Sequence, residues 1–125
     1  MEADLVSYLL AGSPNALVDL IGNRLYAEAF QQKTEFPAIA YSSENEEPQR
    51  LLDGGNGLHK RGVLFVIAAE TAAVADSVAE ALDDLMDNMR TGGSLRGANR
   101  SDKRTDKDQN ANLFIIEANY DVHYV

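Results

Sequence analysis

The stretch that decides the fold is residues 63–69, Val63-Leu64-Phe65-Val66-Ile67-Ala68-Ala69. Side chains along a strand alternate between two faces, and here both alternate sets are apolar. A strand of this kind is either a central strand covered on both faces or a strand with one face buried by another subunit. The run therefore predicts the centre of a sheet, and it suggests that copies of the chain associate.

Two periodic segments follow the run. Residues 71–89 predict a long helix, because apolar side chains recur on one helical face. Residues 113–125 predict a half-buried strand, because apolar and polar side chains alternate along it. The apolar side of the helix holds Val74, Val78, Leu82, Leu85 and Met89, and that of the strand holds Phe114, Ile116, Ala118, Tyr120, Val122 and Tyr124. We therefore expect Tyr120 and Tyr124 in the core rather than on a stacking platform.

The residues before the run predict helices first and strands next. Helical spacing over residues 2–21 predicts two short helices, with Ser13 as the N-cap of the second, Pro14 at its first position and Gly22 as its terminator. Residues 24–69 predict strands, with a hairpin tip at the glycine-rich residues 54–57. The whole order indicates a single α+β domain over residues 1–125. We expect a mainly antiparallel sheet of about four to five strands with helices packed on one side.

Acidic and basic residues are concentrated in different segments of the chain. The long helix carries Asp76, Glu80, Asp83, Asp84 and Asp87, with no Lys or Arg at the helical spacings that would pair with them. Residues 90–107 instead carry six basic side chains against two acidic ones. Because this segment has little apolar periodicity, residues 94–112 predict a short polar strand followed by a long exposed loop. We expect residues 100–112 to be mobile in the free subunit and ordered on docking.

The composition excludes several classes of function. Apolar residues make up 45% and charged residues 25%, as in ordinary globular proteins, and the net charge of −9 disfavours wholesale binding to DNA or an anionic membrane. The absence of cysteine excludes disulfides, thiolate metal sites and a cysteine nucleophile. No segment approaches the roughly twenty apolar residues that span a bilayer, and no signal peptide is evident. We expect a soluble, intracellular protein.

No motif nominates a catalytic, cofactor-binding or metal site. The glycines at residues 92–97 lack the Gly-Lys-Ser/Thr ending of a phosphate loop. Adjacent aspartates at positions 83 and 84 point in different directions on a helix, which argues against a cation site. His59 and His123 are interpreted as incidental. We therefore expect no enzyme activity, no cofactor and no metal.

Taken in order, several segments resemble a known family. They are Gly22-Asn23-Arg24-Leu25-Tyr26, Phe36-Pro37-Ala38-Ile39-Ala40-Tyr41, Leu52-Asp53-Gly54, the strand at 63–69, the helix at 71–89, the charged stretch Arg100-Ser101-Asp102-Lys103-Arg104-Thr105-Asp106 and the closing strand Leu113 to Tyr124. Together they resemble the tail-completion family of long-tailed bacteriophages and related prophage elements. Members of that family act as tail terminators or tail-to-head joining proteins, and the likeness covers nearly the whole chain.

The resemblance implies a structural virion protein rather than an enzyme. It implies a subunit that forms a ring, usually hexameric, which caps the head-proximal end of the tail tube, ends tube polymerisation and joins the tail to the neck or head. The implied partners are further copies of the chain, the tail tube protein and a neck or head-completion protein. Assembly would take place in the host bacterial cytoplasm. DNA would only pass through the ring as cargo, and no membrane would be involved. Partner or subunit contacts are expected at Asp53, Gly54, Asn56, Asp76, Glu80, Asp83, Asp84, Asp87, Arg100, Lys103, Arg104 and Lys107.

Two hypotheses from other classes compete with this one. A nucleic-acid-binding module would use the basic segment 90–107, but the net charge is −9 and no aromatic residues are interleaved with the bases. A small hydrolase-like enzyme would need a nucleophile and base in reach of each other, and the sequence indicates no such pair. Salt-dependent retention on DNA distinguishes the first competitor from a ring-forming subunit.

Overall fold

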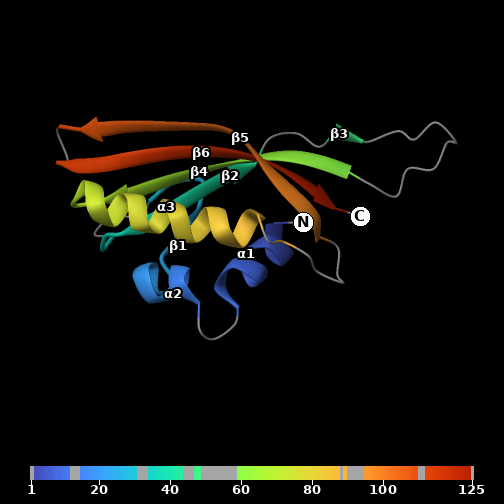
Figure 1. The fold of residues 1–125 in the computed structure, drawn as a ribbon, viewed down its shortest axis with the longest axis horizontal. Coiled ribbons are helices and arrows are strands. Elements are labelled where there is room, and N and C mark those ends of the chain that lie inside the picture. Colours follow the sequence, from blue (N-terminus) through green and yellow to red (C-terminus); the bar gives the residue numbers. More distant parts are fainter. Residues whose placement is uncertain are drawn as a thin grey trace, which may run out of the picture.

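The described residues form three helices and one six-stranded sheet (Figure 1). The computed structural model describes residues 2–11, 15–30, 34–43, 47–48, 59–87, 89, 95–109 and 112–124. The helices are α1 (Glu2–Leu10), α2 (Ala16–Ile21) and α3 (Ala72–Asp87). The strands are β1 (Leu25–Ala27), β2 (Ala38–Ser43), β3 (Glu47–Pro48), β4 (His59–Ala69), β5 (Leu95–Asp108) and β6 (Leu113–Tyr124). The predicted hairpin tip at residues 54–57 lies outside the described residues.

The sheet is mainly antiparallel, as the sequence predicts. Its strand order is β1-β2-β4-β6-β5, and the short β3 pairs with the start of β4. The pairing of β1 with β2 is parallel, while β2, β3 and β6 all run antiparallel to β4, and β5 runs antiparallel to β6. An α+β fold with an antiparallel sheet is therefore confirmed.

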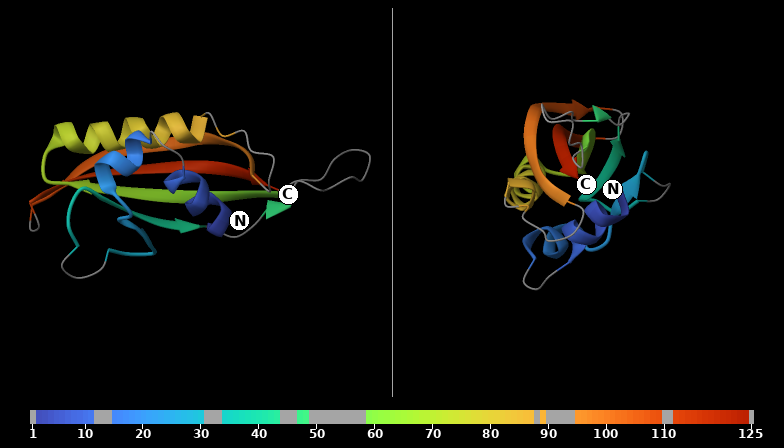
Figure 2. Two further views of the ribbon diagram at one scale, coloured as in Figure 1. Left: turned by 90° about the horizontal axis from the view of Figure 1, so that it is seen from below. Right: turned by 90° about the vertical axis from the view of Figure 1, so that its right-hand side faces the viewer.

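The three helices cover one face of this sheet (Figure 2). On that face β4 presents Val63, Phe65, Ile67 and Ala69, all buried. The core cluster adds Leu5 and Leu9 from α1, Leu17 and Ile21 from α2, and Val78, Leu82 and Met86 from α3. Burial of this apolar surface is the main force that holds the helices to the sheet. The prediction that the helices pack on one side is confirmed.

The opposite face of β4 carries no helix among the described elements. There Leu64 and Val66 are half-buried, and Ala68 is buried. The neighbouring positions on β6 are Asn119, Glu117 and Ile115. The sequence left open whether both faces of this strand are covered within the chain or one face is buried by another subunit. In the structure the helices bury one apolar set of β4, and part of the other set stays accessible.

The side of α3 that is buried differs slightly from the side that the sequence predicts. Thr71 caps the helix, with its hydroxyl oxygen 3.2 Å from the Val74 amide nitrogen. The side chains that α3 buries are Ala75, Val78, Ala79, Ala81, Leu82 and Met86, while Val74 and Leu85 flank the core half-buried. Alanines count little in an apolar periodicity, so the sequence pattern does not include the buried Ala75, Ala79 and Ala81.

Strand β6 follows the alternation that the sequence predicts. Its buried residues are Ile116, Ala118, Tyr120, Val122 and Tyr124. The ring of Tyr120 packs edge-on against Phe65, with centroids 5.8 Å apart. Both terminal tyrosines lie in the core, as predicted.

The start of α2 differs from the prediction. The helix begins at Ala16 with Asn15, rather than Ser13, as its N-cap. The Asn15 Oδ1 atom accepts from the backbone of Leu17 at 3.0 Å and Val18 at 3.2 Å, and Nδ2 donates to the carbonyls of Leu9 at 3.0 Å and Ala11 at 2.6 Å. A side-chain amide has both donors and an acceptor, so Asn15 caps α2 and closes the end of α1 at once. A serine hydroxyl has one donor and could not make all four bonds.

The largest correction concerns residues 94–112. The sequence predicts a short strand and a long loop, but β5 is 14 residues long and pairs with β6 as far as Asp108. Residues 99–109 are exposed, which explains why they show no apolar periodicity. An edge strand needs only the backbone ladder to one partner, and charged side chains on it discourage pairing with other sheets. The bulge near Ser101 is held by its hydroxyl, which lies 3.3 Å from the Asn119 carbonyl oxygen.

Replacing the amide that joins α1 to α2 should destabilise the fold. Asn15→Ala is expected to lower the free energy of unfolding by about 1–2 kcal/mol, because it removes an N-cap and leaves buried backbone groups without partners. Urea unfolding measures this change. The control is Asn23→Ala at an exposed position, expected to stay within about 0.5 kcal/mol of the original chain. Equal stability of the two variants would contradict the role of Asn15.

Candidate interaction surfaces

Most of the described candidate residues are exposed side chains of α3 and β5. Among the residues that the structure describes, no group of three or more His, Cys, Asp or Glu side chains is placed to hold a metal ion. None of the described helices is long and apolar enough to cross a membrane.

The acidic residues of α3 divide between two flanks of the helix. Four of them recur at helical spacing on the flank that faces β5, and we call these the acidic stripe: Asp76, Glu80, Asp83 and Asp87. Asp83 marks this flank, because its carboxylate contacts Tyr120 of β6 and Arg100 of β5. Asp84 lies on the other flank, in a hollow shared with Leu17 of α2. Successive helical residues differ by about 100° in direction, so a single five-residue stripe cannot form.

Asp83 is the best-connected member of the acidic stripe. The Tyr120 hydroxyl donates to Asp83 Oδ1 at 2.8 Å, and Arg100 Nη1 lies 3.6 Å from the same oxygen. Helix α3 has no basic residue to pair with Asp83, and Arg100 of strand β5 takes that place. Since the Arg100 and Asp83 side chains are 43% and 40% exposed, their ion pair contributes at most about 1 kcal/mol. It orients the side chains more than it stabilises the fold.

The environment of Tyr120 perturbs its acidity. Burial raises the pKa of the Tyr120 hydroxyl well above its ordinary value, the hydrogen bond to Asp83 and the charge of Asp83 raise it further, and the charge of Arg100 partly opposes them. The hydroxyl therefore stays protonated at neutral pH and donates to the carboxylate. A polar hollow of about 280 Å³ lies over this group, lined also by Asp87, Ala98 and Asn99.

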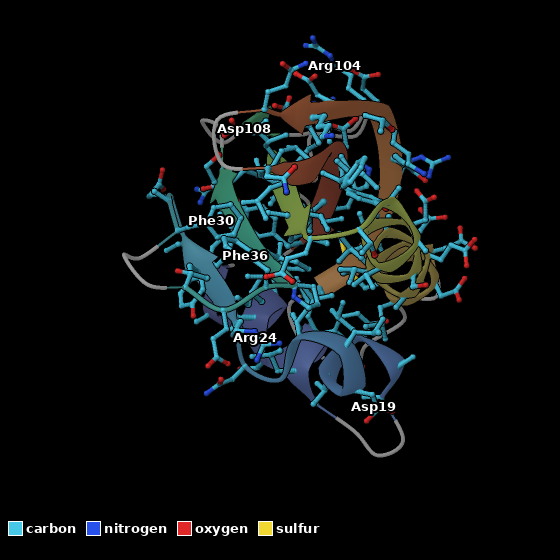
Figure 3. The ribbon with its side chains drawn as sticks, turned by 90° about the vertical axis from the view of Figure 1, so that its left-hand side faces the viewer. Asp19, Arg24, Phe30, Phe36, Arg104 and Asp108 are labelled. Carbon is cyan, nitrogen blue, oxygen red and sulfur yellow. The ribbon has the colours of Figure 1, made fainter. Side chains whose placement is uncertain are left out.

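The predicted basic residues do not form one patch. In the register with β6, Arg100, Lys103 and Lys107 share the helix-covered face, whereas Arg104 lies opposite Glu117 on the other face. The Lys107 ammonium stands 5.1 Å above the Phe114 ring. Figure 3 shows Arg104 pointing outward at the edge of the sheet, away from the helices.

Aspartates interrupt the basic residues of β5. Asp102, Asp106 and Asp108 are interleaved with them along the strand, and Arg100 is engaged by Asp83. Nucleic-acid binding needs a continuous basic surface for phosphate contacts. This arrangement therefore disfavours the nucleic-acid hypothesis. The predicted contact residues Asp53, Gly54 and Asn56 lie outside the described residues, so their role stays a prediction.

An apolar hollow that the sequence does not reveal lies on the far flank of α3. We call it the socket; it measures about 230 Å³ and is lined by Ala11, Asn15, Ala16, Leu17, Ala81, Asp84 and Leu85. Its lining comes from the end of α1, the start of α2 and the second half of α3. No local pattern could have indicated it, because only the packing of α2 on α3 brings these residues together.

Two comparisons with known proteins concern nearly the whole chain. A family model described as Tail completion protein gp17 matches residues 6–124. Among solved structures, a chain from the virion of a native gene transfer agent (GTA) particle superposes with a TM-score of 0.67 at 17% sequence identity. That match covers 99% of this chain and 93% of the other. At this identity the structural likeness shows a shared fold. No curated protein matches the chain.

The raised pKa of the Tyr120 hydroxyl predicts a pH-dependent stability. A group whose pKa is raised on folding stabilises the native state fully below its unfolded pKa, near 10, and this contribution is lost as the pH rises above it. Urea unfolding from pH 9 to pH 11 should show a loss of up to about 1.4 kcal/mol per pH unit from Tyr120. Tyr120→Phe, which has no hydroxyl to titrate, should lose this dependence.

Two comparisons make this test specific. Asp83→Asn removes the second cause of the shift and should weaken the dependence without abolishing it, because burial remains. The contribution of Tyr8, whose pKa burial also raises, is common to all these proteins. Identical slopes in the original chain and in Tyr120→Phe would rule out the assigned environment.

Proposed function

Because the chain belongs to the tail completion protein gp17 family, we propose that it forms a ring at the head-proximal end of a phage tail tube. The chain is a structural protein of a phage-type tail and has its place in the virion; the resemblance seen in the order of its segments is confirmed. The proposed ring is hexameric, ends polymerisation of the tube and joins the tail to the neck or head. DNA passes through its opening.

The main observation in support of this proposal is that the described helices cover only one face of the sheet. All the described helices pack on one face, and Leu64 and Val66 of the central strand stay half-buried on the other. Neighbouring β6 positions Glu117 and Asn119 add polar side chains there. A surface with an apolar centre and a polar border is typical of contact between proteins. It supports association through this sheet face.

The distribution of charge supports a ring over a symmetric dimer. A twofold dimer brings the same patch of both copies together, so a twofold contact centred on the acidic stripe would set like charges against each other. A head-to-tail contact joins two different surfaces, and it generates a closed ring when the rotation between copies closes. The acidic stripe of one copy can then meet a surface of different charge on the next copy, which also steers association.

The proposal is tested with purified protein and tail tubes of the cognate phage. We expect electron microscopy to show a ring at one end of each tube, and tubes with bound rings should no longer elongate when tube protein is added. Weak contacts between copies gain from simultaneous binding to the tube end, so assembly should be stronger with tubes than without them. A chain that stays monomeric and never binds tube ends would refute the proposal.

The acidic stripe gives a second test of the same function. Glu80→Lys should leave the free energy of unfolding within about 0.5 kcal/mol, because Glu80 is exposed, and should reduce the fraction of capped tubes. Asp19→Lys is the matched control, since Asp19 is an exposed acid that belongs to α2 rather than to α3. Unchanged capping by Glu80→Lys would mean that the stripe is only solvated.

A further inference from the structure

The face of the sheet without described helices, which we call the open face, carries a row of paired residues that crosses it from edge to edge. Tyr26 of β1 pairs with Ala40 of β2, and Ala40 pairs with Val66 of β4. Val66 pairs in turn with Glu117 of β6, and Glu117 pairs with Arg104 of β5. Paired residues of neighbouring strands project on the same side of a sheet. The row therefore begins with an aromatic ring at one edge, is apolar at its centre and ends with a guanidinium at the other edge.

Three aromatic rings meet at the β1 edge, and we call them the aromatic cluster: Tyr26, Phe30 and Phe36. The Phe30 ring stands nearly perpendicular to both others, with its centroid 6.5 Å from that of Tyr26 and 5.8 Å from that of Phe36. All three residues are half-buried. Figure 3 shows Phe30 and Phe36 beside β1 and β2, at the opposite edge of the sheet from Arg104. The cluster therefore presents aromatic surface at this edge.

Two carboxylates accompany the aromatic cluster. Glu28 lies two residues before Phe30 in the sequence. Glu35 directly precedes Phe36, and both acids are exposed, with no hydrogen bond or ion pair to their carboxylates within the described residues. The φ of Glu28 is 70°, in the left-handed region where a residue with a Cβ is strained. Backbone strain of this kind gathers at binding sites, where another requirement outweighs it.

Arg104 is the matching cation at the β5 edge. On the helix-covered face of this strand, Arg100 contacts Asp83, and the Lys107 ammonium stands over the Phe114 ring. Arg104 lies on the open face and is exposed, and within the part of the chain that the structure describes its side chain has no hydrogen bond or ion pair. It points outward, away from the helices (Figure 3). Its charge is therefore available to a partner.

The β5 edge favours contact through side chains over the addition of another strand. Asp102 Oδ1 accepts from the Lys103 amide at 2.8 Å, and Asp106 Oδ1 accepts from the Lys107 amide at 2.7 Å. A further strand would have to replace these bonds before it could pair with the two amides. The same bonds turn both carboxylates toward their own backbone. Arg104, between them in the sequence, is the side chain left to make the contact.

An arginine is the cation that suits the aromatic cluster. Its guanidinium is planar and weakly hydrated, so it can stack on an aromatic face while its N–H groups reach a carboxylate. The β1 edge offers rings and carboxylates together. Arginine and aromatic side chains are also enriched among the residues that contribute most to the stability of protein interfaces.

We propose that Arg104 of one copy docks on the aromatic cluster of the next copy in the ring. The guanidinium stacks on the Phe30 ring and pairs with Glu28. Because the two edges of the sheet differ, this contact is head-to-tail and can be repeated from copy to copy around a ring. The inference rests on the proposed function, because it assigns one contact of the proposed ring.

The absence of cysteine makes a clean cross-linking test possible. Ala29→Cys, next to Phe30, and Thr105→Cys, next to Arg104, replace exposed residues, so both proteins should fold. The two proteins are mixed with tail tubes and treated with a short bismaleimide. We expect linked pairs that contain one copy of each variant. Ser77→Cys replaces Ala29→Cys in the control, because Ser77 is exposed on α3 and belongs to neither edge of the sheet.

A chain with both Ala29→Cys and Thr105→Cys distinguishes the possible geometries. A head-to-tail ring gives a ladder of linked copies that ends at the copy number of the ring. A twofold contact gives dimers closed by two links and no ladder, which would overturn the proposal. Rings without links, or with equally strong links to Ser77→Cys, would also overturn the docking contact while leaving the proposed function intact. Failure of the original chain to form rings on tubes would overturn both.

A charge exchange measures the contact independently. Arg104→Glu should raise the protein concentration needed for half-maximal ring formation about tenfold, because it removes the cation and brings two carboxylates together. Adding Glu28→Arg to the same chain should restore most of the original value, because the pair is then reversed. Lys103→Glu is the matched control: it makes the same change of charge one residue away, on the helix-covered face, and should leave the value unchanged. Failure of Glu28→Arg to rescue Arg104→Glu, or an equal effect of Lys103→Glu, would overturn the assigned pair.

The stacking contact is tested with Phe30→Leu, which keeps an apolar side chain and removes the ring. In the original chain it should raise the concentration for half-maximal ring formation about threefold. In a chain that already carries Arg104→Ala, the same replacement should have no further effect, because the guanidinium that uses the ring is gone. Additive effects of the two replacements would overturn the stacking of Arg104 on Phe30.

Discussion

The antiparallel ladder between β4 and β6 joins the other elements of the described structure into one fold. It pairs 11 positions, from His59 with Tyr124 to Ala69 with Phe114. Strand β2 is added on one side of the ladder and β5 on the other. The helices rest on the face that carries Phe65, Ile67 and Ile116. Because side chains alternate along both strands, a shift of the register by one residue would turn this entire face outward.

This constraint decides which surfaces are left for partners. The described helices cover one face of the ladder, and the second apolar set of β4 keeps accessible side chains, Leu64 and Val66, on the other. The position of β5 at the edge also matters, since it brings Arg100 beside Asp83 and closes the polar hollow over Tyr120. Interaction surfaces in this protein therefore follow from how the core is built.

The two flanks of α3 show how neighbouring residues in a sequence come to serve different surfaces. Asp83 faces β5, where a tyrosine and an arginine hold it, and Asp84 faces α2 at the apolar socket. A subunit that contacts a preceding copy, a following copy and the tube must present several distinct surfaces. One helix with carboxylates on two flanks can contribute to two of them, which suits the proposed position in a ring.

The sequence by itself determined the parts of the protein that repeat at a fixed spacing. Alternation along residues 113–124 was enough to assign β6 and its buried side, and the helical period was enough to assign α3, because these patterns record which side of an element meets the core. The ordered series of segments was likewise enough to indicate the family. Only the tertiary structure decided the extent of β5, the role of Asn15 and the existence of the socket. Strand β5 depends on hydrogen bonds to β6 and has no apolar side to reveal it, and Asn15 acts by joining two helices. The socket is formed by residues from three helical segments, whose meeting is a property of packing that no local pattern encodes.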